Sequence, residues 1–373
     1  MRSKQNLLFV THGFFVGGAE TFLANLLNVI DRGKASITVV ALGGKGPVED
    51  ALVNDTVIHL PRGWKFDFSP IGALARLIVK QDITEIFSLG FFSFIFVRLA
   101  LFTIHRSQKI FISVHTTVPR TRKEFLVNWC TSRLLGRKDE IITICNAQAE
   151  YLSRSYHLAK QRFTTIYNGV DVNYFINAPK NFDKASFRRQ YKIPVDATVI
   201  LQIAAFRKEK KQTDSIKALA LFHEKNKTKP YLVFVGKGGT KYEDLAKECV
   251  EHFGLTEYVE FCGEQKDTRP FYWMADMFTL SSNSVETFSM AALEAMSCGI
   301  PCVLTDVGGA REMITEGING LIVPAEQPSA LAGAWSRIIN NKNSFPSAPI
   351  REIAVQRFSL DQMVRNYEAV LVR

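Results

Sequence analysis

Short apolar runs alternate with amphipathic segments along the whole 373-residue chain. The apolar runs are four to six residues long, as buried strands are, and segments such as Glu20–Ile30 and Gln212–Glu224 repeat with a helical period. Because parallel strands need helical crossovers, this alternation predicts an α/β fold with two parallel sheets, each covered by helices on both faces. The expected strands are Leu7–Val10, Ile37–Ala41, Val57–Leu60, Ile86–Leu89, Ile110–Val114 and Ile141–Ile144 in the first half, and Val199–Ala204, Tyr231–Val235, Val259–Cys262, Met277–Leu280, Pro301–Thr305 and Gly320–Val323 in the second.

The length and one polar stretch divide the chain into two domains. A chain of 373 residues exceeds the usual size of a single domain. Residues 173–196 have low hydrophobicity and contain Pro179 and Pro194, so they are expected to link the domains. We therefore expect an N-terminal domain over residues 1–175 and a C-terminal domain over residues 196–357.

The net charge of +10 is concentrated in the first half of the chain. Residues 1–195 hold 26 Lys+Arg against 14 Asp+Glu, and nine basic residues lie from Arg98 to Lys138 against the single acidic residue Glu124. A basic surface indicates an anionic partner, and the absence of a nucleic-acid-binding motif favours a membrane surface over nucleic acid. The alternative that this basic face is solvated and binds no partner remains open.

The most apolar stretch is too short to cross a membrane. Residues 86–97 carry no charge, but Arg98 interrupts the run well before 18–20 residues. We expect a strand at Ile86–Leu89 and a Phe-rich helix at Phe91–Ile104, which either packs in the core or lies in a lipid interface. The apolar run near Met1 is too short for a signal peptide. A cytoplasmic protein, peripheral on the inner face of the cell membrane, is expected.

Six cysteines occur, and none forms a Cys-x-x-Cys pair or a set with zinc spacing. Buried free thiols in a reducing compartment are the simpler interpretation. No Asp-x-Asp pair flanks a strand either. The sequence therefore gives no indication of a metal site.

The strongest chemical signal is a pair of carboxylates, Glu286 and Glu294, separated by seven residues. The segment runs from a predicted strand through a polar loop into a short helix that is expected to end at Gly299. Glu286 should precede the helix and Glu294 should lie inside it. Backbone N–H groups near Phe288, Ser289 and Met290, with the positive end of the helix dipole, suit a phosphate. The carboxylates could accept hydrogen bonds from sugar hydroxyls.

Further candidates follow predicted strands. Gly17 and Gly18 come after the first strand; they do not fit Gly-x-Gly-x-x-Gly, but paired glycines let a backbone approach a ligand. Arg207, Lys210 and Lys211 follow the strand that opens the second half, where cations would favour the departure of a diphosphate. They could also form a surface-exposed basic loop.

Several motifs in a fixed order carry a family resemblance. They are Gly17-Gly-Ala-Glu20, Asn168-Gly-Val-Asp171, the basic stretch Phe206–Gln212, the Glu286/Glu294 pair, Gly308-Gly-Ala-Arg-Glu312 and Gly320-Leu-Ile-Val-Pro324. Together they span nearly the whole chain and resemble the retaining glycosyltransferases of family 4, which have the two-domain GT-B fold. The resemblance implies two Rossmann-like domains facing a central cleft. It implies an acceptor-binding N-terminal domain onto which a C-terminal helix, residues 358–373, packs back, and a C-terminal domain that binds the donor.

The resemblance also assigns roles to individual residues. Glu294 would hold the nucleotide ribose, Glu286 the donor sugar, and Arg207 and Lys210 the diphosphate, with Lys211 as the alternate cation. His115, at a strand end, would lie near the transferred sugar, although a lone histidine is usually structural. The implied catalytic residues are Arg207, Lys210, Glu286 and His115, and the implied donor-binding residues are Gly17, Gly18, Gly236, Thr287, Phe288, Ser289, Met290, Glu294 and Lys211.

Three positions depart from the family pattern. Ala205 stands where many members have the arginine, and Thr287 and Ser289 stand where many have glycine. Both replacements for glycine are small, so phosphate access should survive. The fit to one particular sugar is what these departures affect.

The implied reaction is retaining transfer of a hexose or N-acetylhexosamine from a nucleotide diphosphate sugar, with UDP as the expected base. The acceptor would be a hydroxyl of a glycan, carried on a lipid as in lipopolysaccharide assembly, and no cofactor or metal is expected. Two alternatives remain: a GT-B sugar-nucleotide epimerase or phosphorylase, and a non-catalytic membrane-surface binding protein.

Overall fold

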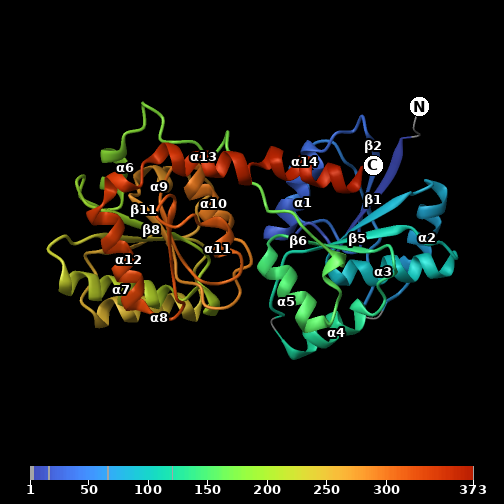
Figure 1. Ribbon diagram of the computed structural model, residues 1–373, viewed down its shortest axis with the longest axis horizontal. Coiled ribbons are helices and arrows are strands. Elements are labelled where there is room, and N and C mark those ends of the chain that lie inside the picture. Colours follow the sequence, from blue (N-terminus) through green and yellow to red (C-terminus); the bar gives the residue numbers. More distant parts are fainter. Residues whose placement is uncertain (1–3, 16, 65–66, 120, 373) are drawn as a thin grey trace. The chain divides into compact units, whose positions relative to one another are not determined.

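The chain folds into two compact units. The computed structural model describes residues 4–15, 17–64, 67–119 and 121–372. Met1–Asn168 and Leu360–Arg373 form the first unit, and Gly169–Ser359 form the second (Figure 1). The chain thus leaves the first unit after Asn168 and returns to it at Leu360 for its last helix.

The first unit is built on a seven-stranded parallel sheet with the order β3-β2-β1-β4-β5-β6-β7. Its strands are β1 (Gln5–Thr11), β2 (Ala35–Ala41), β3 (Val57–His59), β4 (Glu85–Leu89), β5 (Lys109–Val114), β6 (Glu140–Thr143) and β7 (Phe163–Thr165). Its helices are α1 (Gly18–Val29), α2 (Pro70–Lys80), α3 (Gly90–Thr103), α4 (Arg122–Ser132), α5 (Asn146–Tyr156) and α14 (Leu360–Leu371). The short 3₁₀ helices η1 (Pro47–Ala51) and η2 (Lys160–Arg162) lie between them.

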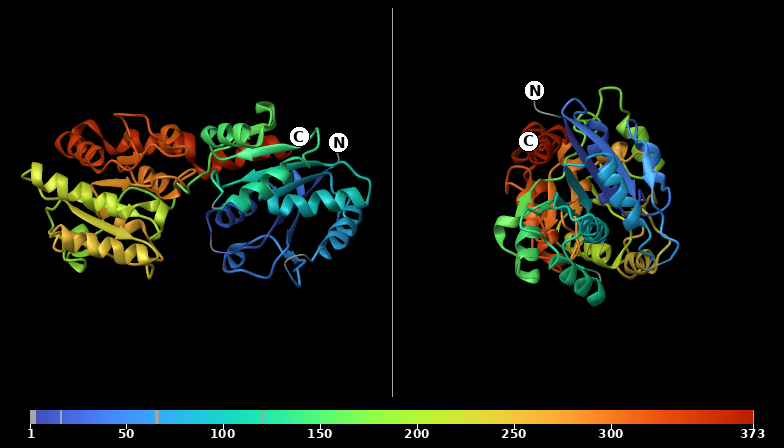
Figure 2. Two further views of the ribbon diagram at one scale, coloured as in Figure 1. Left: turned by 90° about the horizontal axis from the view of Figure 1, so that it is seen from below. Right: turned by 90° about the vertical axis from the view of Figure 1, so that its right-hand side faces the viewer.

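Alternate residues of the strands supply two separate cores, one on each face of this sheet. On one face, residues such as Leu8 and Ile112 pack against α2, α3 and α5. On the other face, Leu7 and Phe111 pack against α1 and α14, to which α14 contributes the fully buried Tyr367. Figure 2 shows the strands lying between these helical layers. Period-two alternation in β-strands therefore places helices on both faces, as the pattern predicts.

The second unit is built on a six-stranded parallel sheet with the order β10-β9-β8-β11-β12-β13. Its strands are β8 (Val199–Ile203), β9 (Tyr231–Val235), β10 (Val259–Phe261), β11 (Met277–Leu280), β12 (Cys302–Thr305) and β13 (Gly320–Val323). Its helices are α6 (Lys184–Gln190), α7 (Gln212–Lys225), α8 (Lys241–His252), α9 (Arg269–Met274), α10 (Met290–Ser297), α11 (Ala310–Met313), α12 (Pro328–Asn340) and α13 (Ser347–Phe358). The 3₁₀ helices are η3 (Lys208–Lys210) and η4 (Lys342–Ser344).

The predicted α/β class with two parallel sheets is confirmed, and each of the twelve predicted strands is present. The strand β7 was not predicted, because it is three residues long and only Phe163 among them is apolar, so it forms no apolar run. The predicted end of α10 is also observed: Gly299 follows the C-cap Cys298 and has φ +74°, a left-handed conformation that glycine adopts without strain.

The Phe-rich segment forms α3, and core packing accounts for most of its phenylalanines. Phe91, Phe94 and Phe96 are buried in the core that α3 shares with α2 and β5. Arg98, which interrupts the apolar run, is buried and pairs with the buried carboxylate of Asp139. The lipid-interface alternative for this helix is therefore not supported, because most of its apolar surface is covered by protein.

Residues 173–196, expected as a link, lie inside the second unit and contain α6. Arg188 of α6 is buried and donates hydrogen bonds to the carbonyls of Met274, Val195 and Ala197 at 2.6, 2.7 and 2.8 Å. A polar side chain thus fastens this stretch to the domain, which hydrophobicity alone does not reveal. Arg120 and Arg373, which fall in the predicted basic run and last helix, lie outside the described residues.

None of the described helices combines the length and apolar composition needed to cross a bilayer.

Candidate functional site

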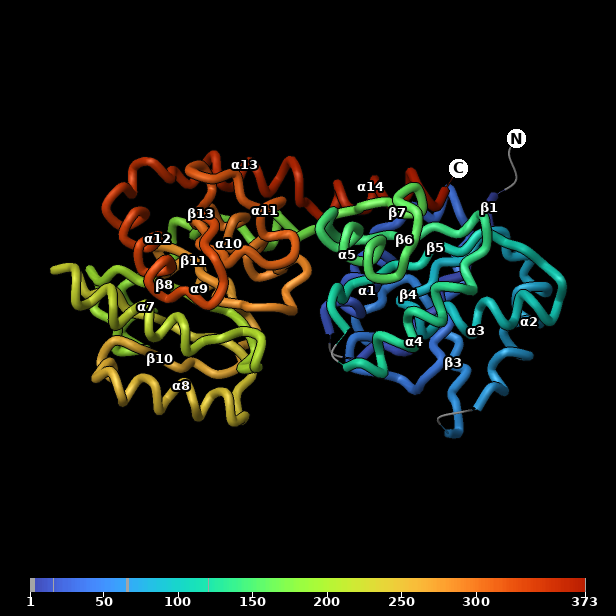
Figure 3. The backbone as a smooth tube through the Cα atoms, turned by 60° about the horizontal axis from the view of Figure 1, so that its bottom comes forward, coloured from blue at the N-terminus to red at the C-terminus, as the bar shows by residue number. Residues whose placement is uncertain are grey.

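In the second unit, the candidate residues gather where β8 and β11 end. These strands are neighbours in the sheet, but the chain continues from β8 toward one edge and from β11 toward the other. Ligands of open parallel sheets bind at the carboxyl ends of strands at such a switch point. The loop after β8 carries Arg207 and Lys210, and the loop after β11 carries Glu286 and leads into α10 (Figure 3).

An ion pair joins these two loops. The Nζ of Lys210 donates to Oε2 of Glu286, and both side chains are less than one-fifth exposed. The same carboxylate oxygen accepts from the hydroxyl of Ser282 at 3.2 Å. Two predicted catalytic residues are therefore in direct contact, and each fixes the position of the other.

The remaining cations of this loop are placed differently. Arg207 precedes η3 and its side chain is exposed. Lys211 has a left-handed backbone with φ +48° and pairs with the exposed carboxylate of Glu326 at 2.8 Å. Arg207 is thus accessible to a ligand, whereas Lys211 is engaged at the rim.

The loop that carries Glu286 is held by buried hydroxyls. Thr305 of β12 donates to the carbonyl of Ser282 at 2.6 Å, and Ser281 lies 2.9 Å from the carbonyl of Lys210. Gly308 packs so closely that a Cβ there would meet the carbonyl oxygen of Glu286 at 1.9 Å. These contacts fix the backbone on both sides of the Lys210–Glu286 pair.

Thr305→Val is expected to lower the free energy of unfolding by about 1–3 kcal/mol, because it leaves a buried carbonyl without its donor. Urea titration would measure this change, with Ser284→Ala, at an exposed position of the same loop, as the control. A loss as small as that of the control would mean that Thr305 does not anchor the loop.

The helix α10 begins beside Glu286 and presents its N-terminus there. Ser289 is the N-cap, and its hydroxyl accepts from the amide of Ala292 at 3.2 Å. A hydroxyl cap is neutral and leaves the positive end of the helix dipole uncompensated, since the first turn of α10 contains no acidic residue. Glu286 precedes the helix and Glu294 lies within it, as predicted, and Thr287, Phe288 and Met290 lie at its start.

Glu294 has a partner that the sequence did not reveal. The hydroxyl of Tyr272, on α9, donates to Oε2 of Glu294 at 2.7 Å, and Tyr272 is fully buried. Burial raises the pKa of Glu294 to about 7, and the hydrogen bond from Tyr272 opposes this rise. Tyr272 lies 22 residues before Glu294, so no local spacing connects the two.

Gly236 lies at the end of β9, next to the loop after β8. Its φ is +147°, and a Cβ there would meet the carbonyl oxygen of Ala204 at 2.3 Å. The carbonyl of Ala205, in that loop, accepts a hydrogen bond from the side-chain amide of Gln212 at 3.1 Å. Gly236 therefore has a packing role, because no larger residue fits between these two strand ends.

Three predicted residues lie in the first unit: Gly17 and Gly18 at the start of α1, and His115 after β5. Gly17 is the N-cap of α1, and a Cβ there would lie 2.4 Å from Oε2 of Glu20. Gly18 has no heavy atom within 4 Å of the corresponding position. The absence of a side chain at Gly17 thus makes room for the carboxylate of Glu20 at the start of α1.

His115 lies after β5 and is held by neighbouring side chains. Its Nε2 is 3.0 Å from the hydroxyl of Ser113, which is 3.4 Å from the hydroxyl of Tyr367. The ring of Phe22 packs against it at 4.3 Å between centroids. Burial lowers the pKa of His115 to about 3, so the imidazole is neutral near pH 7.

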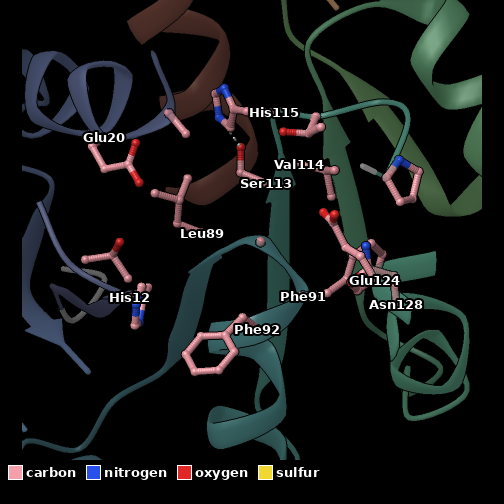
Figure 4. A pocket seen from close by; sticks show the side chains of 15 residues that line it. His12, Glu20, Leu89, Phe91, Phe92, Ser113, Val114, His115, Glu124 and Asn128 are labelled. Atoms are coloured by element: carbon pink, nitrogen blue, oxygen red, sulfur yellow. Dashed lines mark hydrogen bonds between the residues drawn. The ribbon is translucent and has the colours of Figure 1, made fainter. Parts of the chain in front are cut away.

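His115 lines a pocket of about 240 Å³ at the ends of β1, β4 and β5. Figure 4 shows Glu20 on one side of this pocket, Glu124 and Asn128 on the other, and Phe92 and His12 at one end. Phe92 is 38% exposed, which makes its ring available to a ligand. The pocket thus combines an aromatic surface with polar groups that converge from α1, α4 and β5.

Across the described ranges, no group of three or more His, Cys, Asp or Glu side chains is arranged to hold a metal ion.

Two family profiles match the chain, one for each half. The profile described as "Glycosyl transferases group 1" matches residues 183–352, and "Glycosyltransferase Family 4" matches residues 16–174. Together the two matches cover most of the chain. The chain therefore carries a family 4 glycosyltransferase region followed by a group 1 glycosyltransferase region. The first of these matches contains Arg207, Glu286 and Glu294, and the second contains Gly17 and His115.

Solved structures of this class have the same fold. The Anabaena protein Alr3699/HepE, solved in complex with UDP, superposes with a TM-score of 0.84 at 20% identity and covers 98% of this chain and 99% of its own. The lipopolysaccharide outer core galactosyltransferase WaaB, in its apo form, has a TM-score of 0.79 at 18% identity, with 98% and 99% covered. At this identity the likeness shows the fold, which is GT-B as expected.

Curated relatives match over part of their length. A D-inositol 3-phosphate glycosyltransferase of Thermobispora bispora is 26% identical over 223 residues, which is 56% of this chain and 51% of the relative. The chain thus spans about half the length of the curated relatives it matches.

Proposed function

We propose that this protein is a retaining glycosyltransferase that transfers a hexose or N-acetylhexosamine from a UDP-sugar to a hydroxyl of a glycan acceptor. The observation that carries the proposal is the contact between the loops after β8 and β11 beside the N-terminus of α10. This contact brings Lys210, Glu286 and Ser289 together at the carboxyl ends of β8 and β11. The exposed Arg207 lies in the same loop as Lys210. Cations and an uncompensated helix end at one place suit a diphosphate.

The donor assignment follows from how these groups differ. Arg207 and the amides of α10 would bind the phosphates, and Glu294, partly exposed on α10, would accept hydrogen bonds from the ribose hydroxyls. Glu286 would contact the donor sugar while it holds Lys210 in place. The UDP complex of the Anabaena relative supports UDP as the nucleotide.

In the proposed reaction, the acceptor oxygen bonds to the anomeric carbon on the face from which UDP leaves. The bond from that carbon to the β-phosphate oxygen breaks, its electron pair stays on the phosphate, and this oxygen takes the acceptor's proton. Negative charge grows on the diphosphate as the bond breaks, so Arg207 and Lys210 stabilise the transition state more than the ground state. These cations and the helix end serve in place of a metal.

The acceptor is proposed to be a lipid-linked glycan at an anionic membrane surface. The argument rests on α4 and the loop that follows it, where Leu126 and Leu134 are 59% and 38% exposed. Exposed basic residues, among them Lys123, Arg133 and Arg137, lie in the same stretch. Exposed apolar and basic side chains together favour anionic lipid, and we propose a cytoplasmic, peripheral protein. The name of the lipopolysaccharide galactosyltransferase WaaB supports this class of acceptor.

Titration calorimetry with UDP and with GDP tests the proposed donor. UDP is expected to bind in the micromolar range, GDP more weakly, and Arg207→Ala is expected to reduce the UDP affinity about tenfold by removing a charge-assisted contact. Lys208→Ala, an exposed cation one residue away, is the matched control and should change the affinity little. If neither nucleotide binds the wild-type protein, the transferase proposal fails.

A further inference from the structure

The helix ends at the two candidate sites differ in charge. The start of α10 is capped by the neutral hydroxyl of Ser289. The start of α1 contains Glu20, whose carboxylate occupies the space that Gly17 leaves open. A carboxylate in the first turn compensates the helix dipole, so an anionic ligand at α1 would have to compete with Glu20.

The pocket beside α1 carries a second carboxylate. Glu124, on α4, lines the side opposite Glu20 (Figure 4). No Lys or Arg occurs among the described residues that line this pocket. Its histidines do not supply positive charge near pH 7, because burial lowers the pKa of His115 to about 3 and burial with nearby Arg62 lowers the pKa of His12. Among the described residues that line the pocket, the charged side chains are therefore the carboxylates Glu20 and Glu124.

One cation lies close to the pocket without lining it. The guanidinium carbon of Arg62 is 4.6 Å from the centre of the Phe92 ring. Arg62 thus packs on the ring of Phe92 but is not among the residues that line the pocket. If a phosphate ester bound in this pocket, Arg62 would be the cation that contacts its phosphate.

The remaining surface of the pocket suits a sugar ring. Its volume of about 240 Å³ would hold roughly eight waters at liquid density, which is the scale of a single ring. The ring of Phe92 offers an apolar surface to C–H groups, and Asn128 and the carboxylates offer hydrogen-bond partners to hydroxyls. A hydroxyl can donate to a carboxylate, whereas a phosphate is repelled by it.

We propose that this pocket binds an uncharged sugar ring of the acceptor, and that Glu20 and Glu124 reject a ring carrying a phosphate. The inference rests on the proposed function for its acceptor, but it names a selectivity that the fold does not imply. It separates this chain from the relative whose name gives inositol 3-phosphate as the substrate. In a lipid-linked acceptor, the ring in the pocket would be a sugar remote from the diphosphate.

The test compares binding of paired probes by ligand-observed NMR, with UDP present to occupy the donor site. Methyl α-D-glucopyranoside, methyl N-acetyl-α-D-glucosaminide and myo-inositol are each compared with a monophosphate ester of the same ring. At least one neutral ring is expected to bind roughly tenfold more tightly than its ester. Glu20→Gln should bring the ratio of the two affinities, neutral ring over phosphate ester, closer to one. Glu150→Gln, which removes an exposed charge on α5, should leave this ratio unchanged.

Two results would overturn the inference. Tighter binding of the phosphate esters would do so, and loss of that binding in Arg62→Ala would assign it to Arg62. Absence of binding by every neutral ring at tens of millimolar would also do so, because an acceptor subsite should retain at least millimolar affinity for its ring. Binding of UDP in the calorimetric experiment is measured separately, so failure of this inference and failure of the proposed donor are distinguishable.

Discussion

Lys210→Ala is expected to lower kcat by about 100- to 1,000-fold, the loss typical when one group that stabilises developing negative charge is removed. The ammonium of Lys210 has three donors, so it can bind a diphosphate oxygen while it remains paired with Glu286. The affinity for UDP should fall much less than kcat, because the charge grows as the sugar–phosphate bond breaks. The value of kcat is measured as the rate of UDP release from a panel of UDP-sugars with an acceptor present.

Lys210→Ala also leaves Glu286 without its ion-pair partner, so a structural effect must be separated from loss of the cation. Glu286→Gln keeps the shape and removes the charge that Lys210 faces. If kcat falls in Lys210→Ala while its thermal unfolding midpoint stays close to that of Glu286→Gln, the fall in kcat is caused by removal of the Lys210 charge and not by lower stability. Lys208→Ala, on the same 3₁₀ turn but exposed, should retain kcat. Retention of kcat within about threefold in Lys210→Ala would contradict the proposed role.

Glu294→Gln is expected to weaken UDP binding by about 10- to 100-fold at pH 8, because a charged acceptor of two ribose hydroxyls becomes neutral. The pKa of Glu294 is raised to about 7 by burial, so the carboxylate form grows as the pH increases from 6 to 8. UDP affinity should rise over this interval. Ionisation of the terminal phosphate of UDP near pH 6 also raises the affinity as the pH increases. In Glu294→Gln, only this contribution to the rise in affinity should remain.

Tyr272→Phe identifies the source of this pH dependence. The hydroxyl of Tyr272 stabilises the carboxylate of Glu294, so its loss should move the midpoint of the affinity profile above pH 7. The neighbouring thiols of Cys298 and Cys302 have pKa values raised by burial and stay protonated over the same interval. An unshifted midpoint would mean that Tyr272 supports the fold without positioning Glu294.

The ligand-free protein provides an independent readout of Glu294. Its pKa in the folded state lies above the usual value of 4.5, so the folded state binds the proton more tightly than the unfolded chain. The contribution of Glu294 to stability is therefore full below pH 4.5 and is lost as the pH rises through about 7. Urea titrations of the wild type and Glu294→Gln at pH 5 and pH 8 should show this difference.

The elements and the local order of the candidate site in the second unit could be predicted because both depend on local patterns. Apolar runs located the strands, and the polar loop before Ser289 placed Glu286 ahead of α10 and Glu294 within it. The contacts that adjust these groups come from distant positions. Tyr272 reaches Glu294 from another helix, and Lys210 reaches Glu286 from another loop. No spacing along the chain encodes either pair.

The first unit shows the same limit. The sequence predicts that Gly17 allows close approach of a ligand, but the structure gives that space to Glu20. The Phe-rich segment was compatible with both a core and a lipid interface, and only its packing against α2 and β5 decided between them. Single-residue roles at Gly17 and Phe91 therefore depend on neighbours that the sequence alone does not position.

The return of the chain to the first unit has a consequence for synthesis. The core on one face of that sheet includes Met363, Val364, Tyr367 and Leu371 of α14, and Tyr367 approaches the Ser113–His115 pair. A ribosome must therefore finish the second unit before the first can close its core, which reverses the usual N-to-C order of domain completion. Until α14 is synthesised, the apolar residues of α1 and of the sheet that pack against it stay uncovered.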